Sequence, residues 1–209
     1  MSDPADVVGV LPTTPKVESA LALAREHPEE LAHLRQVARL AAILFRELEP
    51  LHGMGDREHE LLCCAALLHD IGISVSYQRH HKHSLRLILE RPLVGFEPDE
   101  QLLVANVARY HRKAKPKAKH AAFAELGDED QETVRRLAAI LRLADGLDRA
   151  HERAVEQLDA VRRTPMHWVI EVRGGGDLAY AVWAAERKAG LFEDVYGVAI
   201  RFEPKGKPA

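Results

Sequence analysis

The sequence predicts a mainly α-helical protein with a small β-α-β unit at its C-terminal end. Its 209 residues are 46% hydrophobic but only 5% aromatic, and long Leu/Ala runs alternate with charged residues, a pattern typical of amphipathic helices. The texture then changes, because "HWVIEVRG" alternates like a strand, "LAYAVWAAERKAGLFEDVYG" has a helical period and "VAIRFEP" is again strand-like. We therefore expect a flexible lead-in over residues 1–16, a helical bundle over 17–163 and a small α/β appendage over 164–209.

Several helical segments should build the bundle. A helical pattern begins near Val17, and Pro28 followed by two glutamates favours a helix start within it. Apolar residues on nearly every side of a second helix indicate that it is buried. This second helix should cover residues 57–70. After it we expect a short helix over 83–90, a helix opened by Pro98 over 97–113 and a loop over 113–128. Residues 129–162 should form one long helix, or two with a bend near Gly146.

Composition also excludes several classes of protein. A net charge of −3 argues against a protein that coats nucleic acid or binds membranes through a polybasic surface. The N-terminal residues have neither the basic start nor the long apolar stretch of a signal peptide, and no apolar run reaches the roughly 18 residues that would span a bilayer. The adjacent cysteines, Cys63 and Cys64, should be small buried residues in a reducing compartment. We expect a cytoplasmic protein.

Histidine is unusually frequent, with twelve in the chain, and several lie in "AALLHDIGISVSYQRHHKHS", residues 65–84. His69 suits a helix C-terminus but Asp70 does not, because the helix dipole disfavours a carboxylate there. Asp145 lies in an apolar helical stretch, where a carboxylate is costly to bury unless it is paired or binds a metal. Imidazole and carboxylate groups contributed by successive helices are typical of a transition-metal site in a helical bundle.

The order of these residues resembles that of the HD-domain superfamily of metal-dependent phosphohydrolases. The segments "HLRQVARLAAILFREL", "ARYHRK" and "LRLADGLDRAH", together with residues 65–84 and "WAAERKAGLFEDVYG", are similar to the C-terminal region of the exopolyphosphatase/guanosine-pentaphosphate phosphohydrolase (Ppx/GppA) family over residues 25–203. The resemblance implies an HD-domain helical bundle. In that family an actin-like lobe precedes this region and carries the polyphosphatase chemistry; nothing in the present sequence resembles that lobe, so we expect the HD part alone.

The resemblance also implies a ligand set. It assigns a first divalent metal to His33, His69, Asp70 and Asp145, and it lets Asp70 bridge to a second metal held by His83 and His111. His80 and His81 remain alternatives for the second group. The metal would be Mn, Fe, Co, Ni, Zn or Mg, and one or two such ions would activate a water for hydrolysis of a phosphoester or phosphoanhydride. Asp70, Lys82 and Arg149 are the expected catalytic residues, and Arg112 and Lys113 could add positive charge for the phosphate oxygens.

Two functions remain open. The first is a metal-dependent phosphohydrolase that acts on a small phosphorylated anion, such as a nucleotide, a (p)ppGpp-like molecule or a polyphosphate. The alternative is a non-catalytic regulatory module that senses such an anion or docks to a separate phosphatase subunit. We expect no membrane and no specific nucleic acid as partner, and a homodimer is possible. Asp148 either orients a ligand histidine or forms a surface ion pair, and Trp168 and Trp183 should pack the appendage onto the bundle.

Overall fold

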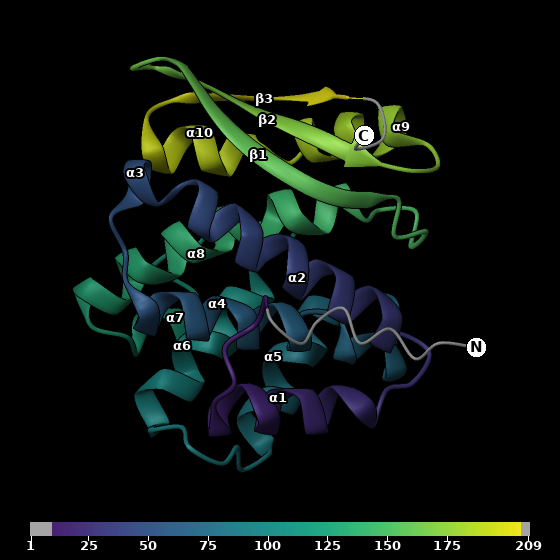
Figure 1. The fold of residues 1–209 in the computed structure, drawn as a ribbon. Coiled ribbons are helices and arrows are strands. Elements are labelled where there is room, and N and C mark those ends of the chain that lie inside the picture. Colours follow the sequence, from purple (N-terminus) through teal and green to yellow (C-terminus); the bar gives the residue numbers. More distant parts are fainter. Residues whose placement is uncertain (1–9, 206–209) are drawn as a thin grey trace.

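Helices form one side of the molecule and a small sheet with two further helices forms the other (Figure 1). The structure is a computed structural model, and it describes residues 10–205. Most of the predicted lead-in, residues 1–9, lies outside the described residues. Helix α1 begins at Pro15, inside the predicted lead-in, because the side chain of Thr14 accepts a hydrogen bond from the backbone N–H of Val17 and caps the helix.

The helices follow the predicted order with shifted boundaries. The expected short helix at 83–90 begins three residues earlier, and the predicted loop after residue 113 contains one helical turn. The helical elements of the bundle are α1 (Pro15–Arg25), α2 (Leu31–Glu47), α3 (Glu49–His52), α4 (Asp56–Leu68), the 3-10 helix η2 (Ile71–Ser74), α5 (His80–Glu90), α6 (Pro98–Arg109), α7 (Ala121–Ala124) and α8 (Asp128–Leu147).

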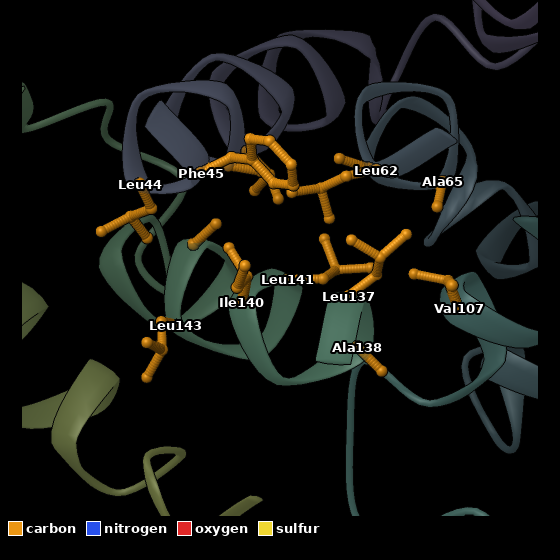
Figure 2. Packing of buried hydrophobic residues seen from close by; sticks show 14 of the residues in the cluster. Leu44, Phe45, Leu62, Ala65, Val107, Leu137, Ala138, Ile140, Leu141 and Leu143 are labelled. Carbon is orange, nitrogen blue, oxygen red and sulfur yellow. The ribbon is translucent and has the colours of Figure 1, made fainter. Parts of the chain in front are cut away.

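The core of the bundle is aliphatic, as the composition predicts. Figure 2 shows Leu44 and Phe45 of α2 and Leu62 of α4 facing Leu137 and Leu141 of α8. Helix α4 is buried on almost all sides from Leu61 to Leu68. The cysteine pair is buried and forms no disulfide, and burial raises the pKa of Cys63 to about 12. None of the described helices has the length and apolarity that crossing a bilayer requires.

The sheet contains three strands in the order β1-β2-β3, formed by β1 (Val155–Thr164), β2 (His167–Gly174) and β3 (Ala199–Pro204). Strands β1 and β2 are antiparallel, whereas β2 and β3 are parallel and are connected through α9 (Leu178–Glu186) and α10 (Gly190–Tyr196). The parallel pair confirms the predicted β-α-β unit. The long helix predicted to run to residue 162 is wrong, because α8 ends at Leu147 and residues 155–164 pair with β2 instead.

The appendage packs on the bundle through a close approach of α9 to α8. A Cβ atom on Gly146 would lie 2.6 Å from the Cα of Ala185, so only glycine allows this distance. Trp168 is 4% exposed and lies in the hydrophobic core, and its packing of the appendage onto the bundle stays a prediction. The same prediction for Trp183 is wrong, because this side chain is 52% exposed.

Candidate metal centre

The site begins where helix α4 ends. His69 caps the helix, Asp70 follows in a non-helical conformation, and the chain turns at once into η2. Gly72 permits this turn, since a Cβ there would lie 2.3 Å from the carbonyl oxygen of His80. Ser84 fixes the contact: its hydroxyl donates to the carbonyl of His69 at 2.7 Å and accepts from the N–H of Gly72 at 3.0 Å. The start of α5 is thereby held against the end of α4.

Asp70 lies at the centre of four imidazole rings. Its Oδ1 is 3.2 Å from Nε2 of His80 and 3.2 Å from Nε2 of His111. Its Oδ2 is 3.6 Å from Nε2 of His69 and 3.9 Å from Nε2 of His33. Two groups with metal-ligand spacing result, His33–His69–Asp70 and Asp70–His80–His111, and they share the carboxylate of Asp70.

In each of the four rings Nε2 faces Asp70, and the second nitrogen, Nδ1, forms a hydrogen bond that sets the tautomer. Nδ1 of His69 lies 2.8 Å from the carbonyl of Ala66, and the same contact to the residue three positions earlier recurs at His80 and His111, at 2.9 and 2.7 Å. Since a carbonyl only accepts, Nδ1 carries the proton in all three rings. In the neutral ring Nε2 then carries a lone pair, and all three Nε2 atoms face Asp70; that of His80 also accepts a hydrogen bond from the guanidinium of Arg112 at 3.1 Å.

This donor set fits a cation. Nε2 of His80 and Nε2 of His111 are 3.3 Å apart, and both face a carboxylate oxygen, so acceptor atoms meet without a proton between them. Among the described residues, Nε2 of His33, Nε2 of His69 and Oδ1 of Asp70 are buried without a hydrogen-bond partner. Such a cluster is costly to bury unless positive charge occupies it. Imidazole and carboxylate donors together suit a divalent transition metal.

Asp148 holds the ring of His33. Its Oδ2 lies 2.8 Å from Nδ1 of His33, and its Oδ1 accepts the backbone N–H of Arg153 at 2.9 Å. The ring of His151 stacks on His33 with centroids 3.8 Å apart. Burial lowers the pKa of His33, but the bond to Asp148 and the charge of Asp145 outweigh it and leave the pKa raised. This geometry favours the interpretation in which Asp148 orients a ligand histidine over the one in which Asp148 forms a surface ion pair.

Asp145 of α8 completes one side of the cluster, with its Oδ1 3.8 Å from Nε2 of His33. Its other oxygen accepts a hydrogen bond from the ammonium group of Lys188, which lies between α9 and α10. Burial alone would raise the pKa of Asp145, but the charge of Lys188 and the nearby imidazoles lower it. Asp70 behaves alike: burial raises its pKa, and the imidazoles of His69 and His111 bring it well below its usual value.

Burial disfavours the charged form of the deepest histidines. It lowers the pKa of His69, which is fully buried, and it lowers the pKa of His111 to about 3. Neutral imidazole is the form that binds a metal.

Not every residue expected at the site reaches it. His80, rather than His83, joins Asp70 and His111: His80 is 2% exposed in the cluster, whereas His83 is half-buried and belongs to neither three-residue group. His81 lies near His111, with ring centroids 6.5 Å apart, and is also outside both groups. Lys82 is exposed and does not line the cleft described next.

A cleft of about 500 Å³ opens above the cluster, and Asp70, His80, His111 and Asp145 form part of its floor. Positive side chains dominate its walls; they are Arg112, Lys113, Lys115, Arg142, Arg149, Arg187 and Lys188. The sequence singled out Arg112, Lys113 and Arg149. Arg187 and Lys188 lie in the segment "WAAERKAGLFEDVYG", which had no charge role assigned from the sequence, and the structure places them in the cleft where α9 packs closely on α8 at Gly146.

Comparisons with known proteins identify the family to which this region of the chain belongs. The family described as Ppx/GppA phosphatase, domain III, matches residues 16–174. A guanosine-5′-triphosphate,3′-diphosphate pyrophosphatase of Pseudoalteromonas atlantica is 27% identical over 110 residues, which cover 52% of this chain and 21% of that protein. The protein of the same name from Pseudoalteromonas translucida is 36% identical over 52 residues, covering 25% of this chain and 10% of its own length. The matches thus span about a fifth or less of these relatives.

Proposed function

Because the chain belongs to the Ppx/GppA phosphatase domain III family, we propose that it is a metal-dependent phosphohydrolase with an HD-type site. The proposed substrate is a phosphate-rich anion: a nucleotide, a guanosine polyphosphate or a short polyphosphate. The printed names of the two relatives, both pyrophosphatases of a guanosine polyphosphate, support this substrate class.

One observation carries the proposal. Histidine Nε2 lone pairs from three separate parts of the bundle converge on one buried carboxylate, directly below a cleft with cationic walls. A metal-binding floor and a phosphate-binding wall are the two components that metal-assisted phosphate hydrolysis requires.

In this proposal His33, His69, Asp70 and Asp145 would hold one divalent ion, and Asp70, His80 and His111 would hold a second. Bound ions would supply Lewis acidity, which lowers the pKa of a water and neutralises charge on the phosphate oxygens. The protein's own part is to keep the ring protons on Nδ1, through the carbonyls of Ala66, Tyr77 and Ala108 and the carboxylate of Asp148, so that the Nε2 atoms face Asp70. At His80 a bound ion would replace the hydrogen bond that Arg112 donates to Nε2.

The cationic walls would position the phosphate. Arg149 and Arg187 can each present two parallel N–H groups to phosphate oxygens, and Lys188 offers a point charge beside Asp145. Because Lys188 also pairs with Asp145, its ammonium group can move from that carboxylate to a phosphate oxygen when substrate enters. Lys82, expected in this role from the sequence, is not part of the proposal.

A regulatory module is the alternative function. The matched segment covers only 21% of the first relative, so the activity in that protein's name can belong to the remaining part. In this case the cleft would bind the phosphorylated anion without cleaving it.

Metal content and phosphate release together test the proposal. Untagged protein purified without chelators is analysed for bound elements as wild type, as Asp70→Ala and as the nearly isosteric Asp70→Asn, which guards against loss of folding. We expect a near-stoichiometric transition metal in the wild type only, and phosphate release from tripolyphosphate or GTP that depends on it. A folded wild type that neither binds nor is stabilised by Mn²⁺ would contradict the enzyme and favour the regulatory module.

A further inference from the structure

Three large aromatic side chains are exposed close to the cationic cleft. Trp183 and Tyr180 of α9 are 52% and 40% exposed, and Tyr77, in the turn before α5, is 61% exposed. The rings of Tyr180 and Trp183 stack with centroids 5.6 Å apart at an interplanar angle of 29°. We call these three residues the aromatic rim. Exposed aromatic rings gathered beside a polar cleft are a common mark of a binding site.

Arginines connect the aromatic rim to the cleft. Arg187 lines the cleft, and its guanidinium lies over the ring of Trp183, 5.2 Å from the centroid. Arg149 also lines the cleft; burial lowers its pKa, but the neighbouring Tyr77, Asp145 and Tyr180 outweigh this effect and leave the pKa raised, so Arg149 lies near both tyrosines of the rim. Tyr77 in turn contacts His80 of the metal cluster, with ring centroids 5.5 Å apart. The rim and the floor of the cleft are thus linked through shared side chains.

We propose that the aromatic rim is a stacking platform for the nucleobase of a nucleotide whose phosphates lie in the cationic cleft. Trp183 offers the largest exposed ring, and Arg187 stacks on it in the way that guanidinium groups accompany base stacking. The proposal rests on the proposed function, since it takes the cleft as the phosphate site. It adds a choice among the candidate substrates: a nucleotide is favoured over an inorganic polyphosphate.

The physical reason for this choice is the hydrophobic area involved. A bare polyphosphate has only charged oxygens, which arginine and lysine bind and which gain nothing from an indole ring. A nucleobase has an apolar face that removes water from Trp183 and Tyr180 when it stacks on them. Stacking is tolerant of base identity, so the rim predicts a preference for nucleotides over polyphosphate rather than for one base over another.

Binding measurements on the full chain test the platform without requiring turnover. Mn²⁺-loaded protein is titrated calorimetrically with the β,γ-methylene analogue of GTP and, separately, with methylenediphosphonate, which has no base. We expect Trp183→Ala to weaken the GTP analogue about tenfold and Trp183→Phe to restore most of the affinity, because a ring remains. Methylenediphosphonate should bind each variant with wild-type affinity.

Met166→Ala is the matched control, because Met166 is similarly exposed, at 56%, but lies in the turn between β1 and β2. It should change neither affinity. Tryptophan fluorescence gives a second readout: in a Trp168→Phe background the exposed Trp183 is the remaining tryptophan, and the GTP analogue should quench it whereas methylenediphosphonate should not.

Two results would overturn the platform. One is an equal loss of affinity for both ligands in Trp183→Ala. The other is an unchanged affinity of Trp183→Ala for the GTP analogue. If this unchanged affinity is accompanied by dissociation of a dimer in sedimentation, Trp183 belongs to a dimer contact instead. Failure of the proposed function looks different. If the Trp183 variants show the expected binding pattern but the wild type releases no phosphate from GTP with Mn²⁺, the platform stands and the hydrolase is refuted.

Discussion

Two groups of buried histidines lie at opposite ends of the packed helices α2 and α4. At one end, His33 and His69 point Nε2 lone pairs at Asp70. At the other, His52 and His59 both pack on Phe45, with ring centroids 4.3 and 5.1 Å from it. All four side chains are at most 6% exposed, so burial does not distinguish the two groups.

The difference is clear at His52, whereas Nε2 of His59, like Nε2 of His33 and His69, is buried without a hydrogen-bond partner. Nε2 of His52 lies 2.7 Å from the carbonyl of Phe45, and its Nδ1 accepts the N–H of Met54 at 2.9 Å, so both nitrogens are satisfied by backbone. Among residues 10–205 no carboxylate forms an ion pair with His52, whereas Oδ2 of Asp70 lies 3.6 Å from Nε2 of His69. A histidine with two backbone partners stabilises the fold, whereas one with a free lone pair aimed at a carboxylate prepares a cation site.

The largest effect should come from His69→Gln. Removing this imidazole takes one ligand from the cluster, so we expect metal affinity to fall by more than about 100-fold and phosphate release to fall with it, since even outer partners of a ligand are worth 10–100-fold. The metal-free protein should keep its unfolding free energy within about 1 kcal/mol, because the lost group made only one backbone contact. Elemental analysis and urea denaturation measure the two quantities. A variant that keeps the metal would remove His69 from the ligand set.

A smaller effect is expected from Asp148→Asn. The amide can still meet His33, but it no longer stabilises positive charge on the ring or fixes the proton on Nδ1, so metal affinity should fall about 10- to 100-fold. Competition with a fluorescent chelator gives the affinity. Asp159→Asn, at an exposed carboxylate paired with Arg173, is the control and should bind metal like the wild type. Equal affinities in the two variants would mean that Asp148 has a structural role alone.

The histidine at the opposite end predicts the reverse pattern. His52→Ala leaves the carbonyl of Phe45 and the N–H of Met54 without their partner and should lower the unfolding free energy by about 1–3 kcal/mol. Bound metal per folded chain should not change. Urea denaturation measures the unfolding free energy, and elemental analysis of the same preparation measures the bound metal. Loss of metal from folded His52→Ala would show that the two ends of the bundle are coupled.

The smallest effect is a pH dependence from the same residue. Burial lowers the pKa of His52 below its usual 6.5, with the charge of Arg136 adding to this effect while the bond to Phe45 and the carboxylates of Glu49 and Glu58 oppose it. The unfolded chain therefore binds a proton near pH 6.5 that the folded chain does not. Stability from this group is complete above pH 6.5 and is lost as the pH falls below it, by at most about 1.4 kcal/mol per pH unit.

His52→Gln should therefore have a shallower loss of unfolding free energy between pH 6.5 and 5 than the wild type. Urea denaturation at four or five pH values measures both slopes. Because His59 also has a pKa lowered by burial, some dependence should remain in the variant. Identical slopes would show that folding does not lower the pKa of His52.

Periodicity was sufficient to predict α4, α6 and most of α2, since each buries a wide apolar face. It failed at β1, where the register shift between Val155 and Gln157 disrupts the two-residue alternation. The remaining residues of that strand include Glu, Gln, Leu and Ala, which favour helices, so only pairing with β2 makes it a strand.

The candidate site was predicted to a similar extent. The structure brings His33, His69, Asp70, His111 and Asp145 together, and their role as metal ligands stays a prediction. The choice between His80 and His83 was decided by the position of α5, which depends on the contact at Gly72 and not on sequence spacing. Arg187 and Lys188 could not be predicted, because a residue at a helix junction reaches the cleft only through tertiary packing.

The pairing of Lys188 with Asp145 also bears on how the protein is synthesised. A chain made from its N-terminus presents every candidate metal ligand by residue 145, whereas Arg187 and Lys188 follow more than forty residues later. Under the proposed function, a nascent bundle would therefore present the His–Asp cluster while one wall of the cleft is still missing. The order of translation would then place metal capture before nucleotide binding.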